Sequence, residues 1–324
     1  MRSHRRVHAA PPRHRWIDRV AANRVNAQDR ITRIDRILAT DPDRDDERVA
    51  RLRKEAEYLE RVVAGTVQLY LYDHDASRII EMIGAPSATT TTVVTSGPGT
   101  YTSLFNFYDG GVQQVSKHLT DKVPGTIAFV YKDGLFPGED TATGGMNALR
   151  IGEANDADRA RSAGKQLASF EAGMRSDPVL GAARQVAIGH SWGLANVTSS
   201  EVAGAHYDKV VSLSGAGMLP EWQKNPQTTY LDLSFRDILQ SGQGLGVVWD
   251  GNNPRTNPAF EHGEYYRGPD DKYLDPVTVH TMDGPVTTYD GRALGVLVDN
   301  HNLITQNTPS NFRVLFDLQR WLDG

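Results

Sequence analysis

Residues 185–199, QVAIGHSWGLANVTS, change character in the middle of the stretch. An apolar run that is typical of a buried strand ends at Gly189, and a run of small residues that favours a helix begins after Gly193. Ser191 lies between the two glycines, where the chain must turn sharply. In a nucleophile elbow only very small residues fit two positions before and after the central serine. We therefore interpret Ser191 as a candidate nucleophile, and the alternative is an ordinary loop serine.

A serine nucleophile needs a base and a carboxylate that orients the base, and after an elbow these follow in the chain order serine, acid, histidine. His301 ends the stretch LGVLVDNHN just before the final predicted helix, where the base belongs, and His280 in VTVHTMDG is the reserve. The acid is expected just beyond the strand predicted at 228–235. The first acid there is Asp237, which is our prediction.

The developing oxyanion needs two backbone N–H donors. One is expected from Trp192, the residue after the nucleophile, and the other from the loop TSGPGTYTS at 95–103, where Thr100 is our choice. His190 adjoins Ser191, but successive side chains diverge at a tight turn. We therefore assign His190 a packing and hydrogen-bonding role beneath the turn.

Composition limits the other classes of function. The 324 residues carry 39% hydrophobic and 23% charged side chains with a formal net charge of −5, which favours a globular protein without bulk attraction to nucleic acid. The chain has no cysteine, so disulfides and thiolate metal sites are excluded. The glycine-rich stretches 95–103 and 242–246 lack the phosphate-loop and dinucleotide patterns. We predict no cofactor and no metal.

The first 64 residues differ from the rest. Residues 1–15 are predicted to be a disordered basic leader, and 16–64 a helical hairpin that breaks at ATDPDRDD, with a partner that the sequence does not identify. No signal-peptide pattern and no apolar run long enough for a membrane helix is visible. The compartment stays open, with the cytoplasm as default and a processed or non-classically secreted form as the alternative.

Residues 65–324 are predicted to form one α/β domain with a mostly parallel sheet flanked by helices. A β-hairpin is expected over 66–84, before strand-like and helix-like stretches alternate. Strands are predicted at 90–97, 126–133, 184–190, 208–215 and 228–235, and helices at 104–119, 157–175, 192–204 and 310–322 with Ser310 as N-cap. The stretch 240–285 is rich in Gly, Pro, Asn and aromatic residues and is expected to form a lid or pocket wall.

Six segments come in an order that resembles a known family: PGTYTS, AFVYKDGLFPGE, AGKQLASFEAGMRS, VAIGHSWG, DKVVSLSGAG and SFRDIL. They are similar to an actinobacterial α/β-hydrolase family first catalogued as a domain of unknown function. The resemblance covers roughly residues 65–320. It implies an α/β-hydrolase fold with a triad of Ser191, Asp237 and His301. Trp192 stands where members typically show Tyr, and Asn302 where they show Ser.

Together these features predict a serine hydrolase, carboxylesterase-like or lipase-like, that acts on a small-molecule ester through a covalent acyl-enzyme. An apolar acyl or aromatic group is expected in the substrate, with Trp249, Tyr265 and Tyr266 as candidate pocket residues and ordinary packing as their alternative role. Two other functions stay open: an acyltransferase that uses the same triad, and a catalytically silent fold that binds a partner through the helical hairpin.

Overall fold

The structure, a computed structural model, describes residues 15–40, 46–140, 145–244, 246–281 and 284–324. The predicted disordered leader and the acidic break of the helical hairpin fall largely on residues 1–14 and 41–45, which lie outside the described residues.

Within the described residues, a mostly parallel sheet of eight strands forms the centre of the fold, in the order β1-β2-β4-β3-β5-β6-β7-β8. β2 is antiparallel to β1 and β4, and the pairs from β4 to β8 are parallel. The strands are β1 (Gln68–Asp73), β2 (Arg78–Ile83), β3 (Thr92–Gly97), β4 (Thr126–Lys132), β5 (Arg184–His190), β6 (Lys209–Leu213), β7 (Thr229–Leu233) and β8 (Glu261–His262). The central strands are apolar almost throughout because helices cover both faces of the sheet.

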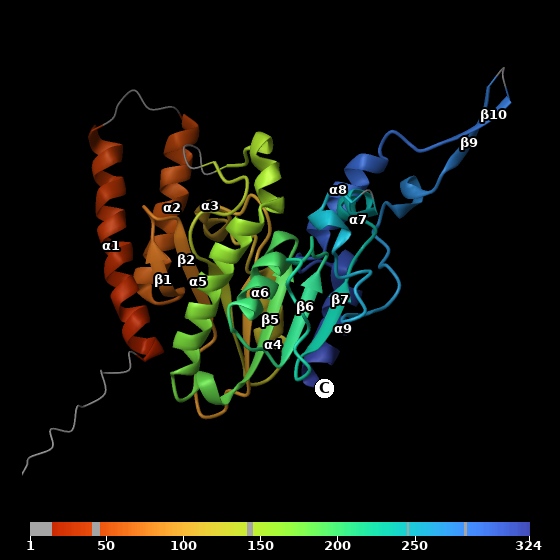
Figure 1. Cartoon of the computed structure of the whole chain (residues 1–324). Helices are drawn as coiled ribbons and strands as arrows, with labels where there is room; N and C mark the ends of the chain where they lie inside the picture. Colours follow the sequence, from red (N-terminus) through yellow and green to blue (C-terminus); the bar gives the residue numbers. More distant parts are fainter. Residues whose placement is uncertain (1–14, 41–45, 141–144, 245, 282–283) are drawn as a thin grey trace, which may run out of the picture.

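Helices form the outer layers (Figure 1). They are α1 (Trp16–Thr40), α2 (Asp46–Ala64), α3 (Leu104–Tyr108), α4 (Gln114–Lys122), α5 (Ala157–Arg175), α6 (Trp192–Val202), α7 (Ile238–Gly244), α8 (Ala293–Leu303) and α9 (Phe312–Asp323). α5 and α6 share one apolar cluster with the sheet, to which Leu167 and Leu194 belong. α4 and α9 share another, to which Leu119 and Leu318 belong. No helix among the described residues is long and apolar enough to cross a membrane.

The helices α1 and α2 lie at the β1 end of the sheet (Figure 1). Ile34 of α1 and Leu59 of α2 are fully buried in a cluster with Leu69 of β1 and Phe107 of α3. α1 also runs along β1, the edge strand of the sheet, and such cover protects the unpaired backbone groups of an edge. These two helices therefore share their core with the α/β domain.

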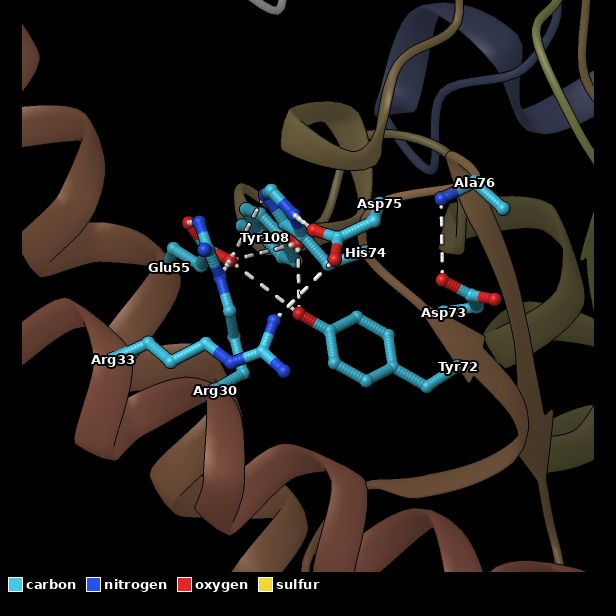
Figure 2. A network of polar contacts seen from close by, with 9 residues as sticks. All are labelled: Arg30, Arg33, Glu55, Tyr72, Asp73, His74, Asp75, Ala76 and Tyr108. Carbon is cyan, nitrogen blue, oxygen red and sulfur yellow. Dashed lines mark hydrogen bonds and ion pairs between the residues drawn. The ribbon is translucent and has the colours of Figure 1, made fainter.

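A polar network joins the same elements (Figure 2). Arg30 of α1 donates two hydrogen bonds to the carboxylate of Glu55 of α2, at 2.7 and 2.9 Å. The Tyr72 hydroxyl lies 3.4 Å from Glu55 Oε1 and 3.4 Å from the Tyr108 hydroxyl, and His74 Nε2 lies 3.6 Å from Glu55 Oε1. The buried carboxylate of Glu55 thus has partners from α1, β1, α3 and the turn after β1.

Two local expectations were wrong. The helix predicted over 104–119 is two helices, α3 and α4, because the chain between them turns at Gly110 with φ +80°. The N-cap of α9 is Asn311 and not Ser310, because a 3₁₀ turn over Pro309–Asn311 precedes this helix. The other predicted helices and the strands of the sheet fall on the observed elements to within a few residues at their ends.

Candidate active site

Ser191 connects β5 directly to α6 and has an unusual backbone conformation. Its φ is +53° and its ψ is −124°, a region that non-glycine residues rarely adopt. The Ser191 N–H donates to the Leu213 carbonyl at 3.2 Å, and the Ser191 carbonyl accepts from the N–H groups of Leu194 and Ala216 at 3.2 and 3.0 Å. Several backbone hydrogen bonds therefore hold the strained turn in place.

The two glycines beside Ser191 allow the chain to pass very close to its neighbours. A Cβ atom at Gly189 would lie 2.5 Å from the Leu194 Cα, and one at Gly193 would lie 2.0 Å from the Gly97 carbonyl oxygen. Neither contact leaves room for a side chain. Glycine is therefore needed at both positions because the turn packs closely against its own helix and against the end of β3.

The structure brings His301 and Asp237 together, although they are far apart in the chain. His301 Nδ1 lies 3.2 Å from Asp237 Oδ2, and the Asp237 side chain is fully buried. The Leu239 N–H donates to Asp237 Oδ1 at 2.8 Å. Asn300 Nδ2 donates to the Arg236 carbonyl at 2.8 Å, which ties the loop after β7 to α8. The sequence analysis did not predict a role for Asn300. The one feature that could have pointed to it is its position next to His301.

His190 packs directly against His301. The centroids of the two imidazole rings are 4.9 Å apart, and His190 Nε2 lies 3.0 Å from the His301 carbonyl oxygen. Since that oxygen can only accept, His190 Nε2 carries the hydrogen. Burial, and then the neighbouring His301, lower the pKa of His190 to about 3. His190 is therefore a neutral support under the His301 backbone and ring.

His280, the reserve base, belongs to a different part of the molecule. Its strand β9 (Val277–Thr281) pairs with β10 (Gly284–Thr288) in a hairpin. This hairpin projects away from the body of the protein in Figure 1, and its backbone is remote from the β5–α6 turn.

Both proposed oxyanion donors lie near Ser191. Trp192 is the first residue of α6, where a backbone N–H has no acceptor within its own helix. Thr100 lies in the loop after β3, and a Cβ atom at its neighbour Gly99 would come within 2.8 Å of the Ser191 Cβ. The Tyr101 N–H is engaged by the Pro137 carbonyl at 2.8 Å, whereas the Thr100 N–H donates to no acceptor in the described part of the chain.

Ser191, His301 and Thr100 line a single cavity of about 860 Å³. This volume lies within the range of roughly 300–1,000 Å³ that is usual for small-molecule sites. Among its described lining residues there is no Asp, Glu, Lys or Arg. No hydrogen bond joins the Ser191 hydroxyl to His301 among the described residues, and catalytic hydrogen bonds are often long until substrate binds.

The cavity wall differs from the predicted one. Of the described residues in 240–285, Val248 alone lines the cavity, while Met146, Ile151 and Ala154 contribute a wall from the segment after β4. This segment includes the 3₁₀ helix η1 (Ala148–Asn155). The sequence of this segment shows no pattern that predicts a cavity wall.

The aromatic residues considered for the pocket have packing roles. Trp249 is buried and belongs to the apolar cluster that also contains Leu194 of α6. Tyr265 stacks against Arg255, and the Tyr266 hydroxyl donates to Asp317 at 2.7 Å. The Trp192 ring packs on Phe136 at 4.9 Å between centroids and lies outside the cavity lining.

The sheet order and the helices on both faces define the α/β-hydrolase class of folds. No family model matches the sequence, and no curated protein matches it. Among solved structures, the chain is similar to a dienelactone hydrolase-like promiscuous phosphotriesterase from metagenomic libraries, at 14% identity and a TM-score of 0.40, over 78% of this chain and 95% of that one.

Two further solved structures are also similar. One is a protein designated m3DLH, at 16% identity and a TM-score of 0.41, over 76% of this chain and 92% of that one. The other is a lipase-esterase related protein from Clostridium acetobutylicum, at 15% identity and a TM-score of 0.27, over 46% of this chain and 51% of that one. At such identities the similarity concerns the fold alone.

Proposed function

We propose that the protein is a serine hydrolase of carboxylic esters, with Ser191, His301 and Asp237 as its triad. The observation that carries the proposal is the arrangement around one cavity. A serine on a strained strand-to-helix turn and a histidine with a buried carboxylate partner both belong to it. These are the groups that a nucleophile elbow and its charge-orienting pair require.

In the proposed first half-reaction, His301 Nε2 accepts the Ser191 hydroxyl proton as Oγ attacks the ester carbonyl carbon. The tetrahedral intermediate then collapses, the bond to the leaving alkoxide breaks, and His301 returns the proton to that oxygen. In the second half, His301 deprotonates water as the water oxygen attacks the acyl carbon. The bond between this carbon and Ser191 Oγ then breaks, His301 returns the proton to Oγ, and the acid is released. Atoms and protons balance over the cycle, with ester and water giving acid and alcohol.

The other polar groups act on charge that develops during these steps. Asp237 accepts from His301 Nδ1, which fixes the tautomer that leaves Nε2 free and stabilises the imidazolium. The N–H groups of Trp192 and Thr100 are the proposed oxyanion donors, and the positive end of α6 adds to their effect.

The cavity favours an uncharged substrate with an apolar part. Its described lining holds apolar side chains such as Val115, Leu239 and Val298 and no Asp, Glu, Lys or Arg. A carboxylate in the substrate would be buried here without a counter-ion, which is costly.

A matched pair of substrates tests the proposal. We expect the wild type to hydrolyse p-nitrophenyl butyrate and Ser191→Ala to be inactive. The mono-p-nitrophenyl ester of succinate has an acyl chain of the same length, with a carboxylate in place of the terminal methyl group. We expect the wild type to hydrolyse this ester at least tenfold more slowly. Equal hydrolysis by wild type and Ser191→Ala would contradict the proposed nucleophile. Preference for the charged ester would contradict the proposed substrate class.

A further inference from the structure

Apolar side chains that line the Ser191 cavity are also exposed at its opening. Met146 and Ile151 come from the segment after β4, and Val298 comes from α8. Each of them is both a cavity-lining residue and an exposed one. The apolar wall of the cavity therefore continues onto the outer surface on two sides.

Three more exposed apolar residues extend this surface. Leu149 of η1 is 96% exposed, and Val247 and Leu294 are each 63% exposed. Leu294 lies one helical turn before Val298 and shares its face of α8. α7 and α8 contact each other and lie at the same end of the sheet (Figure 1).

A hydrogen bond connects the segments that carry these residues. Asn155 Nδ2, at the end of η1, donates to the Val247 carbonyl at 2.8 Å, and Val248 next to it lines the cavity. Met146, Ile151 and Val298 line the cavity, and Leu149, Val247 and Leu294 are exposed apolar residues of the same segments or next to a lining residue. We call these six residues the apolar rim. Contiguous exposed apolar groups in one place generally mark an interaction site.

Charge around the rim argues against an anionic partner. The arginines next to the rim residues in the chain are already paired: Arg150 with Glu153 at 2.8 Å, and Arg292 with Asp290 at 3.0 Å. Two exposed acidic residues, Asp250 and Asp299, lie close in the chain to the rim residues Val247 and Val298. Neither forms an ion pair with a described residue. The rim therefore fits a surface without net negative charge.

The position of the rim also limits its occupant. Anything that covers the rim covers the entrance to the cavity. A protein bound there would close the site, whereas a lipid layer would supply apolar esters through the same opening. We propose that the apolar rim docks the protein on the surface of an uncharged lipid phase, from which an ester enters the Ser191 cavity. This inference rests on the proposed ester hydrolysis.

Binding of the full chain to phosphatidylcholine vesicles tests the inference. The chain carries Ser191→Ala, so that ester hydrolysis does not disturb the vesicles. We expect this protein to co-sediment with the vesicles. Leu149→Asp or Val247→Asp should lower its vesicle partition coefficient about tenfold or more. The reason is that burial of one large aliphatic side chain changes a partition coefficient by about one or two powers of ten. Replacing a third of the lipid with phosphatidylglycerol is expected to leave binding equal or weaker.

Val25→Asp is the matched control, since Val25 is a 61% exposed residue of α1 far from the rim. It should bind vesicles as the parent does. The inference is overturned if the parent does not bind, if Val25→Asp is as damaging as the rim variants, or if binding needs phosphatidylglycerol. It is also overturned if sedimentation shows a dimer that Leu149→Asp dissociates, because the occupant is then a second copy.

A soluble ester separates this inference from the proposed function. In the otherwise wild-type chain, Leu149→Asp and Val247→Asp should hydrolyse p-nitrophenyl acetate as the wild type does, because neither residue lines the cavity. Hydrolysis without vesicle binding overturns the docking surface alone. Vesicle binding without hydrolysis of any ester overturns the proposed function and supports the surface.

Discussion

The His190 imidazole lies against that of His301, with ring centroids 4.9 Å apart and its Nε2 atom 3.0 Å from the His301 carbonyl oxygen. The two histidines come from the end of β5 and from α8, so this contact ties the segment that carries the proposed nucleophile to the segment that carries the proposed base.

Replacement of His190 should therefore weaken catalysis without removing any reacting group. We expect His190→Ala to lower kcat on p-nitrophenyl butyrate about tenfold with little change in KM, because His301 loses a support that fixes its position. The exposed His206, replaced by Ala, is the control and should leave kcat unchanged. A KM effect with normal kcat would contradict the positioning role.

Asp237→Asn should leave the site folded but remove the charge that we propose stabilises the His301 imidazolium. We expect kcat to fall by about 10²–10⁴-fold. Asp299→Asn provides a close control, since Asp299 is an exposed carboxylate two residues from His301 in α8. Comparable losses in the two variants would mean that the Asp237–His301 hydrogen bond has no special role.

Gly193→Ala should destabilise the protein, because its new Cβ would lie 2.0 Å from the Gly97 carbonyl oxygen. Overpacking of this kind costs about 1–3 kcal/mol or more in the free energy of unfolding. Gly173→Ala in α5 meets nothing within 4 Å and should be neutral or stabilising by up to about 1 kcal/mol. Urea unfolding of both variants gives the comparison, and equal stability of the two would contradict the close approach of α6 and β3.

Glu171 predicts a dependence of stability on pH. This fully buried carboxyl group of α5 accepts from the Thr95 hydroxyl at 2.7 Å, and burial raises its pKa to about 7. The folded state thus keeps a proton that the unfolded state releases near the ordinary glutamate pKa of 4.5, so the contribution of Glu171 to stability falls as pH rises from about 4.5 to 7.

Glu171→Gln removes this ionisation and can still accept from Thr95. We expect it to raise the free energy of unfolding by about 1–3 kcal/mol at pH 8.5 and to have a much smaller effect at pH 5. Chemical denaturation at the two pH values measures the difference. A larger gain at pH 5 than at pH 8.5 would reverse the predicted sign.

Local sequence patterns predicted those helices, strands and turns whose formation depends mainly on their own residues. Apolar runs predicted the strands, and the glycines around Ser191 predicted the turn because the close approach permits no side chain at Gly189 and Gly193. Chain order and position next to predicted elements indicated Asp237 and favoured His301 over His280. The structure places His301 Nδ1 3.2 Å from Asp237 Oδ2. Their role in catalysis stays a prediction.

What the sequence did not predict depends on contacts between distant segments. The cavity wall comes from η1, whose residues show no pattern that distinguishes a wall from a surface loop. The aromatic residues Trp249, Tyr265 and Tyr266 have the composition of a pocket but find packing partners elsewhere. The support of His301 by His190 and Asn300 also needs the tertiary arrangement of β5, β7 and α8.

The most direct test of the central claim is covalent labelling of the intact protein with a fluorophosphonate, followed by mass mapping of the modified peptide. The account predicts a single phosphonylated residue, Ser191, in the wild type, and no labelling of Ser191→Ala at the same probe concentration. Labelling of another residue, or equal labelling of the two proteins, would contradict the assignment of Ser191 as the nucleophile.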